Sequence, residues 1–480
     1  MSTLARAPES PPSIVVIGGG ITGLTAAYRL QSLAREHAFP LAVRLLESSD
    51  RLGGKIRTAR VDAFTVEEGP DIFLARKPAG VNLCRELGLE GRLRPTNPDH
   101  RGSLILRDGE LFPLPEGLSA MIPTRLKPFL RSPLLSPWGK IRMGADWLLP
   151  ARSGEADESV ASFFSRRLGR ELYEKIVDPL LGGLYGGSGD VLSLKATFPH
   201  LRALEREHGS LLRGLLARRG ATRQSGGAFV TLEGGMEELT ATLERTLTGV
   251  RVTTGAPVRS LSPRASGFSV VTDHDRYEAD AVLLATPAYV SGALVAPFDD
   301  ALARDLGSIR YGSTVTLSLA YRLRDVPRPL DAYGYIIPRS EGRPVLACTW
   351  SSTKIPGRAP EGMALLRVFL GRSDDYETAG RPDHALLALA REELRATLGI
   401  TAEPLFHHLR RWERAMPLYT LGHPERLARI AGRLSAHPGL FLAGAAFHGV
   451  GIPDCIRDGE TKAGGAFAFV RALAASTHAS

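Results

Sequence analysis

Residues 13–47 hold the feature that most restricts how this chain can fold. They read Ser-Ile-Val-Val-Ile-Gly-Gly-Gly-Ile-Thr-Gly-Leu, then a helical stretch, then Val-Arg-Leu-Leu-Glu ending at Glu47. Gly18, Gly20 and Gly23 have the G-x-G-x-x-G spacing, in which the first glycine permits a tight turn, the second admits a pyrophosphate and the third lets the helix pack on the strand. The helix N-terminus offers unpaired N–H groups to phosphates, and Glu47 is placed to accept a ribose hydrogen bond. The pattern predicts a dinucleotide site.

The residues that follow favour FAD over NAD. Ser48-Ser-Asp-Arg51-Leu-Gly53-Gly54-Lys55 comes directly after the ribose acid. A basic residue beside a glycine pair makes a second close approach to a diphosphate, as in many two-domain flavin oxidases. A polar surface turn is the alternative interpretation. The stretch Glu68-Gly69-Pro70-Asp71 is either another glycine turn near the ring system of the cofactor or a plain loop.

Composition limits the class of protein. At 480 residues the chain is longer than one ordinary domain, so we expect two or three domains. The net charge of +9 fits either scattered surface arginines or attraction to an acidic substrate or an anionic membrane. No basic run interleaved with aromatic residues occurs, so nucleic acid is not an expected partner. The three cysteines, Cys84, Cys348 and Cys455, lack metal-ligand spacing, so we expect no metal site and a reducing, cytoplasmic location.

The order of the expected elements predicts an α/β fold. It combines a discontinuous, Rossmann-like FAD-binding domain, a substrate domain with a mixed sheet, and a helical region that faces a membrane or the substrate. The alternating segments 313–321, 334–337, 345–350 and 364–370 indicate the sheet of the substrate domain. The expected boundaries are 13–95, 228–295 and 432–480 for the FAD-binding domain, 96–227 for the helical region (which begins with a hairpin at 101–115) and 296–431 for the substrate domain.

The tract at residues 121–150 mixes basic and large apolar residues. Its basic members are Arg125, Lys127, Arg131, Lys140 and Arg142. Such a stretch can lie on a membrane surface, whereas the alternative is an ordinary helical layer with solvated basic faces. No run of about 18 apolar residues is present, so no membrane-spanning helix is expected.

A second glycine turn precedes the last expected helix. Val450-Gly451-Ile452-Pro453-Asp454 is expected to be a turn, before a helix from about Cys455 to Ala475. We call its first three residues, Val450-Gly451-Ile452, the closing turn. A helix N-terminus aimed at the N1–C2=O edge of a flavin would stabilise the negative charge of its reduced form. A simple strand-turn-helix is the alternative. Gly464 and Gly465 are expected to allow close packing of this helix on the sheet.

No sequence order of the Ser/His/Asp type and no isolated carboxylate pair stands out. His407, His408, His423 and His448 are each expected to be structural or exposed. In hydride transfer to a flavin the cofactor carries the chemistry and the protein positions and tunes it. We therefore assign no catalytic residue.

The chain from residue 14 to about residue 473 resembles the porphyrinogen oxidases of haem synthesis, flavoproteins of the amine oxidase superfamily. The most specific matching pieces are Asp178-Pro-Leu-Leu-Gly-Gly-Leu-Tyr185, Leu194-Lys-Ala-Thr-Phe-Pro199 and Gly449-Val-Gly-Ile-Pro-Asp-Cys-Ile456. The resemblance implies the three regions described above and an FAD cofactor. It also implies O2 as the electron acceptor, H2O2 as a product, peripheral contact with the inner face of the cell membrane and a haem-pathway enzyme as partner.

Two branches of that family differ at a few positions. Protoporphyrinogen oxidases usually have Gly-Pro-Asn near the flavin, Asn-Asp-Cys in the closing motif and an arginine that opens the hairpin strand and holds a propionate. This chain has Asp71, Pro453 and Ser103 there, and so resembles the bacterial coproporphyrinogen III oxidases. The expected reaction is the six-electron oxidation of coproporphyrinogen III to coproporphyrin III. The alternatives are protoporphyrinogen IX as substrate, an amine oxidase, and a flavin-binding protein without turnover.

The glycine patterns and the resemblance together assign the site residues. Those assigned to FAD are Gly18, Gly19, Gly20, Ile21, Thr22, Gly23, Glu47, Ser48, Arg51, Gly53, Gly54, Lys55, Gly69, Pro70, Asp71, Ile72, Val258, Trp412, Val450, Gly451 and Ile452. Those assigned to the tetrapyrrole substrate are Arg76, Lys77, Arg101 and Phe369, the last standing where some relatives have a tyrosine.

Overall fold

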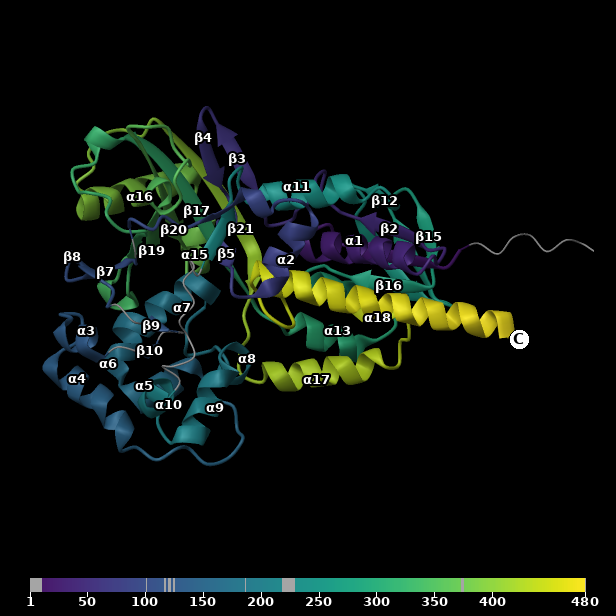
Figure 1. Cartoon of the computed structure of the whole chain (residues 1–480), viewed down its shortest axis with the longest axis horizontal. Helices are drawn as coiled ribbons and strands as arrows, with labels where there is room; N and C mark the ends of the chain where they lie inside the picture. Colours follow the sequence, from purple (N-terminus) through teal and green to yellow (C-terminus); the bar gives the residue numbers. More distant parts are fainter. Residues whose placement is uncertain are drawn as a thin grey trace, which may run out of the picture.

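The structure is a computed structural model that describes residues 11–100, 102–115, 118–119, 122–123, 126–185, 187–217, 229–372 and 375–479. Figure 1 shows a parallel sheet with its helices on the right, a second sheet at the upper left and a group of short helices below that second sheet. The α/β fold expected from the sequence is confirmed.

A five-stranded parallel sheet draws its strands from three distant parts of the chain. The order across the sheet is β12, β2, β1, β16, β22, and every neighbouring pair is parallel. The strands are Val250–Thr253 (β12), Ala42–Leu46 (β2), Ser13–Ile17 (β1), Ala281–Leu284 (β16) and Leu440–Leu442 (β22). The sheet thus joins the three segments that the sequence places in one nucleotide-binding unit.

Alternation along the strands explains the two apolar cores around this sheet. In β1, Ile14 and Val16 pack into one core, and Val15 and Ile17 pack into the other. The helices that cover the first core are α1 (Ile21–Glu36), α2 (Pro78–Glu86), α11 (Glu237–Thr246) and α18 (Ile452–Ala479). The elements that cover the second are β13 (Val258–Pro263), β14 (Phe268–Thr272), β15 (Arg276–Ala279), α12 (Ala288–Val295), α13 (Asp300–Gly307) and α17 (His423–Leu434).

A seven-stranded mixed sheet forms the second unit, and its order is β21, β17, β20, β19, β18, β7, β8. The strands are Phe406–Pro417 (β21), Tyr311–Arg322 (β17), Met363–Leu370 (β20), Val345–Trp350 (β19), Gly334–Ile336 (β18), Leu104–Arg107 (β7) and Glu110–Pro113 (β8). One face is apolar and packs against α16 (Asp383–Leu398). The short α14 (Ser351–Lys354) follows β19, and α15 (Tyr376–Gly380) precedes α16.

Two parts of this sheet differ from the simplest expectation. The β7–β8 hairpin precedes the helices in sequence, yet β7 pairs in parallel with β18 and so extends the sheet. The edge strand β21 has the sequence FHHLRRWERAMP over 12 residues, which lacks a run of apolar residues. Its side-chain pattern therefore does not predict a strand. The backbone hydrogen bonds of its long antiparallel pairing with β17 hold it in the sheet.

A group of short helices, which lies between β8 and β11 in the sequence, shares a third apolar core. They are α3 (Leu126–Arg131), α4 (Pro137–Gly144), α5 (Val160–Leu168), α6 (Arg170–Leu172), α7 (Asp178–Tyr185), α8 (Leu194–Thr197), α9 (Pro199–His208) and α10 (Leu211–Ala217). We call residues 126–217 the helical region. Gly209, at φ +72°, turns the chain between α9 and α10 and so separates these two helices. Within the described ranges, no helix combines the length and apolar character needed to cross a bilayer.

Smaller strands connect these units. The β3–β4 hairpin and two short antiparallel sheets consist of Thr58–Val61 (β3), Phe64–Glu67 (β4), Phe73–Leu74 (β5), Leu93–Pro95 (β6), Phe229–Leu232 (β11), Leu118–Ser119 (β9) and Ile122–Pro123 (β10).

A buried ion pair holds the helical region together. Arg167 on α5 and Asp146 are both fully buried, with Arg167 Nη2 2.5 Å from Asp146 Oδ1. Arg167 also donates to the carbonyl oxygens of Leu149 and Gly209, and Asp146 accepts the backbone N–H of Leu212 at 2.9 Å. The pair therefore ties together three segments that meet beneath the apolar core.

Replacing Arg167 by Met is expected to destabilise the protein by about 3–5 kcal/mol, because it leaves the buried Asp146 carboxylate without a counter-charge. The measurement is the midpoint of urea unfolding followed by circular dichroism. Arg170→Met is the matched control, since Arg170 pairs with Glu174 on the surface, where such pairs contribute at most about 1 kcal/mol. Equal midpoints for the two variants would contradict the role given to Arg167.

Candidate functional site

The glycine loop, residues 18–23, connects β1 to α1 as the sequence predicts. Gly18 has φ +107° and lies against the backbone of Ala285, the residue after β16. A Cβ added to Gly23 would lie 1.8 Å from the Gly18 carbonyl oxygen, so only glycine fits there. A Cβ added to Gly20 would meet no atom within 4 Å. The loop is thus closed on its packing side and open at Gly20, as a pyrophosphate cradle requires.

The second glycine pair lies directly on the first loop. The Gly53 N–H donates to the Gly19 carbonyl at 2.8 Å, and a Cβ on Gly54 would lie 3.0 Å from the Gly20 Cα. The two glycine motifs are therefore in direct contact and lie side by side. Arg51, however, turns its guanidinium to Glu237 on α11 at 2.7 Å.

Glu47 follows the end of β2 and fixes the shape of the loop. Its Oε2 accepts the Gly19 N–H at 2.6 Å, and its Oε1 accepts the Ser49 N–H at 2.9 Å and the Ser48 hydroxyl at 3.2 Å. The backbone of Ala256 bonds to the Glu47 carbonyl at 2.8 Å. This bond places half-buried Val258, at the start of β13, beside the same corner.

Lys55 and Gly69 bring the next two motifs into contact. A Cβ on Gly69 would lie 1.9 Å from the Lys55 carbonyl oxygen and 3.7 Å from the Trp412 ring. The Lys55 side chain is exposed to solvent, yet burial among surrounding protein lowers its pKa. The Lys55 side chain is thus open to solvent although protein surrounds its amine.

The closing turn reaches the glycine loop through α18. A Cβ on Gly459 would lie 2.5 Å from the Thr22 carbonyl oxygen, so this glycine permits the close crossing of α1 and α18. The Cys455 thiol, whose pKa burial raises to about 11, lies near both Thr22 and Lys55. The expected close packing on the sheet is confirmed at Gly465, where a Cβ would lie 3.3 Å from the Phe441 ring on β22. It is wrong at Gly464, where a Cβ would meet no atom within 4 Å. Gly459 faces α1 instead.

The face of the seven-stranded sheet opposite α16 is mostly polar and meets residues 67–71, which we call the acidic segment. The Glu68 carbonyl oxygen accepts three donors from three strands: Thr316 Oγ1 at 3.2 Å, Arg367 Nη2 at 2.8 Å and Trp412 Nε1 at 2.8 Å. The buried Glu68 carboxylate contacts Arg57 Nε at 2.9 Å and His408 Nε2 at 2.9 Å. One residue thus anchors the acidic segment to the sheet.

Asp71 lies farther along the acidic segment and has its own cation. Lys354 Nζ on α14 is 2.7 Å from Asp71 Oδ2. Burial acts to raise the pKa of the Asp71 carboxyl, but the charges of Lys354 and Arg367 outweigh it and hold that pKa below its ordinary value. Burial also raises the pKa of Glu67 to about 7, against the opposing charge of Arg358.

The structure separates the residues assigned to the substrate. Phe369 is half-buried on the polar sheet face, with the Arg367 Cζ 4.8 Å from its ring centroid. Lys77 Nζ contacts Asp454 Oδ2 in the first turn of α18, and Arg76 is exposed. Arg101 lies outside the described residues. Sequence reasoning missed Lys354 and Arg367, and nothing in their local patterns marks them.

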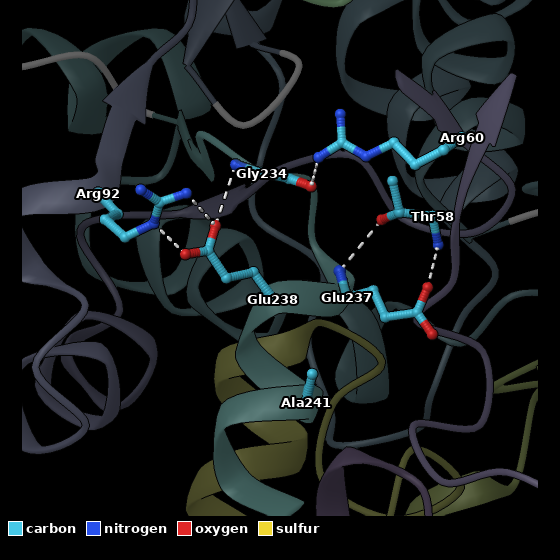
Figure 2. A pocket seen from close by; sticks show the side chains of 7 residues that line it. All are labelled: Thr58, Arg60, Arg92, Gly234, Glu237, Glu238 and Ala241. Carbon is cyan, nitrogen blue, oxygen red and sulfur yellow. Dashed lines mark hydrogen bonds and ion pairs between the residues drawn. The ribbon is translucent and has the colours of Figure 1, made fainter. Parts of the chain in front are cut away.

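A separate cavity of about 350 Å³ lies beside the first turn of α11. Figure 2 shows that its carboxylates already have partners: Glu238 pairs with Arg92, and Glu237 accepts the Thr58 backbone N–H. In the part of the chain that the structure describes, no three His, Cys, Asp or Glu side chains are placed to hold a metal ion. The glycine loop, Lys55, the acidic segment and the closing turn therefore make up the candidate site.

Comparisons with known proteins identify the family. The family model for flavin containing amine oxidoreductase matches residues 21–465. A coproporphyrinogen III oxidase of Bacillus subtilis (strain 168) is 35% identical and aligns over 95% of this chain and 98% of its own. A protoporphyrinogen oxidase of Homo sapiens is 34% identical, with 94% and 97% covered.

A crystal structure from Exiguobacterium sp. 255-15 matches with a TM-score of 0.85 at 33% identity, covering 95% of this chain and 99% of that one. The chain belongs to the flavin containing amine oxidoreductases, among the porphyrinogen oxidases, and is an FAD-dependent oxidase.

Proposed function

We propose that this enzyme oxidises coproporphyrinogen III to coproporphyrin III, with three O2 reduced to three H2O2. Six hydrogens leave the macrocycle in this reaction, as three hydrides and three protons. FAD, when bound, accepts hydrides and passes electron pairs to O2. The chain has to hold the cofactor, orient the macrocycle and provide a suitable electrostatic environment.

We assign the cofactor contacts to the residues that converge in the candidate site. The glycine loop and Gly53–Gly54 would hold the diphosphate, and Glu47 the ribose. Lys55, residues 69–72, Trp412 and the closing turn would surround the ring system. The open space at Gly20 and the accessible Lys55 amine are the features that fit this assignment.

An excess of positive charge around the acidic segment supports coproporphyrinogen III, rather than protoporphyrinogen IX, as the substrate. The cationic side chains that contact this segment number five, against its three carboxylates: Arg57, Lys354, Arg358, Arg367 and Arg410 against Glu67, Glu68 and Asp71. Two positive charges are therefore uncompensated among these groups. Arg57 and Arg410 are 36% and 39% exposed, so their charges are open to an approaching anion. An anionic ligand therefore suits this surface, and coproporphyrinogen has four propionates where protoporphyrinogen has two.

The residues that distinguish the branches point the same way. Asp71 replaces the asparagine of the protoporphyrinogen branch and pairs with Lys354. Pro453 occupies an early position of α18, where proline is compatible with a helix. Lys77 is engaged by Asp454, so we propose that it acts on substrate only by exchanging that partner for a propionate.

The two porphyrinogens give a direct test. Purified protein with FAD is incubated in air with each porphyrinogen, and porphyrin fluorescence and H2O2 are followed together. We expect faster turnover of coproporphyrinogen III and one H2O2 per electron pair. Faster turnover of protoporphyrinogen IX would favour the sister activity, whereas H2O2 from amines alone would favour an amine oxidase.

Gly20→Val tests the cofactor assignment. The Gly20 backbone has φ −72° and ψ 178°, which valine adopts readily, and its side chain would enter open space. The variant is expected to fold but to be purified without yellow colour, because the side chain would occupy the position of the pyrophosphate. Gly91→Val, also into open space, is the control and should retain FAD. Stoichiometric FAD in Gly20→Val would refute the contact.

We further propose that the helical region rests on an anionic membrane surface. An apolar patch of five exposed side chains lies on α3, α4 and the turn after it: Leu130, Trp138, Ile141, Trp147 and Leu148. Trp138 and Leu148 are 79% and 86% exposed. Lys127 and Arg131 are exposed nearby, which suits anionic lipid headgroups. Arg142, by contrast, donates hydrogen bonds to the carbonyl oxygens of Arg166 and Arg167 at the end of α5. Arg125 lies outside the described residues.

Vesicle sedimentation tests this contact. Replacing both Trp138 and Leu148 by Ser is expected to weaken binding to phosphatidylglycerol-containing vesicles by roughly tenfold or more, given the apolar area lost. Leu323→Ser with Leu405→Ser removes exposed apolar side chains elsewhere and should leave binding unchanged. Failure of the unaltered protein to bind such vesicles would instead favour a haem-pathway protein as the occupant of the patch.

A further inference from the structure

Tyr419 holds the loop that leads into the closing turn. It lies two residues after β21 and is 3% exposed. Its hydroxyl donates to the Ala445 carbonyl at 2.7 Å and accepts the Gly449 N–H at 2.7 Å. One phenol thus bridges both ends of the segment 445–449, directly before Val450.

The bridged loop depends on outside contacts for its shape. It is bounded by Gly444 at φ +128° and Gly449 at φ +132°, conformations that favour glycine and leave no side chain to pack. On one side α18 holds it, since Asp458 Oδ2 accepts the Gly444 N–H at 2.7 Å. On the other side Tyr419, which follows β21 of the seven-stranded sheet, holds the loop.

The Tyr419 ring is itself fixed in place. It stacks on His423, with ring centroids 4.2 Å apart and planes 12° from parallel. His423 is 1% exposed, and burial, helped by the charge of Arg426, lowers its pKa to about 4. His423 is therefore neutral near neutral pH, and it adds no positive charge to the stack.

The main chain of Tyr419 is bound to the helical region. The Ser193 N–H donates to the Tyr419 carbonyl at 2.7 Å, and the Leu421 N–H donates to the Val191 carbonyl at 3.1 Å. Figure 1 shows α8, which begins after Ser193, beside the start of α17. The residue therefore joins the helical region through its backbone and the closing turn through its side chain.

We propose that Tyr419 is a positioning residue that sets the place of the closing turn against the flavin and couples that place to the helical region. This inference rests on the proposed assignment of the closing turn to FAD. A turn held in register keeps the N-terminus of α18 aimed at the flavin edge, where its partial positive charge favours the reduced, anionic cofactor. Motion of the helical region would reach the flavin through this residue.

Tyr419→Phe removes the two hydrogen bonds and keeps the ring stack. We expect FAD to bind roughly tenfold more weakly, as for the loss of hydrogen bonds at a bound loop, and the flavin reduction potential to become more negative. Binding is measured by quenching of flavin fluorescence and the potential by dye-linked titration. Tyr311→Phe is the control, because that buried phenol also accepts a backbone N–H, from Ala288 at 2.8 Å. An unchanged FAD affinity and potential in Tyr419→Phe would overturn the proposal.

A second pair of variants tests the link to the helical region. Ser193→Pro removes the N–H that bonds Tyr419, and its native φ of −68° suits proline. Ser193→Ala loses the same hydroxyl cap but keeps the N–H. A more negative flavin potential in Ser193→Pro than in Ser193→Ala supports the coupling, and equal potentials overturn it. This pair also decides the matter if Tyr419→Phe does not fold.

These measurements separate the inference from the proposed reaction. FAD affinity and reduction potential need no porphyrinogen, so they test Tyr419 even if the enzyme proves to oxidise another substrate. Conversely, coproporphyrinogen turnover by the unaltered protein with unchanged potentials in all variants would retain the reaction and reject the positioning role.

Discussion

The close crossing of α1 and α18 is the contact on which the candidate site depends. It brings the first and last helices of the described chain together, and Gly459 makes it possible by leaving no side chain between α18 and the Thr22 carbonyl. The glycine loop at the start of α1 and the closing turn at the start of α18 therefore lie at one end of the parallel sheet. This arrangement places two helix N-termini at the proposed FAD site, where they would favour an anionic group.

The polar face of the seven-stranded sheet completes the site through Glu68. Three side-chain donors converge on one carbonyl oxygen, and further cations surround the carboxylate of the same residue. A carbonyl oxygen with several donors is a fixed point, because displacing it would leave several buried groups without partners. The sheet and the acidic segment consequently act as one body, with Lys354 and Arg367 keeping Asp71 ionised.

The helical region is built on a different balance of forces. Its interior is apolar but contains the Arg167–Asp146 pair, which gains its stability only while both partners are present. Its outer surface carries the exposed apolar patch. Residues 191–193, paired with 419–421, are where this region meets the segment that positions the closing turn.

The sequence by itself determined the β1–loop–α1 unit, the glycine loop, the mixed α/β class and the flavin family, because these follow from spacings within a few residues of one another. Backbone conformation at Gly18 and close packing at Gly23 are local demands that only glycine meets. The tertiary structure decided the rest. The Lys354–Asp71 pair joins residues 283 positions apart, the rotation of α18 selects Gly459 rather than Gly464, and the polar strand β21 is ordered by pairing with β17. Such contacts form only when segments distant in the sequence pack together. Patterns within a few residues therefore do not predict them.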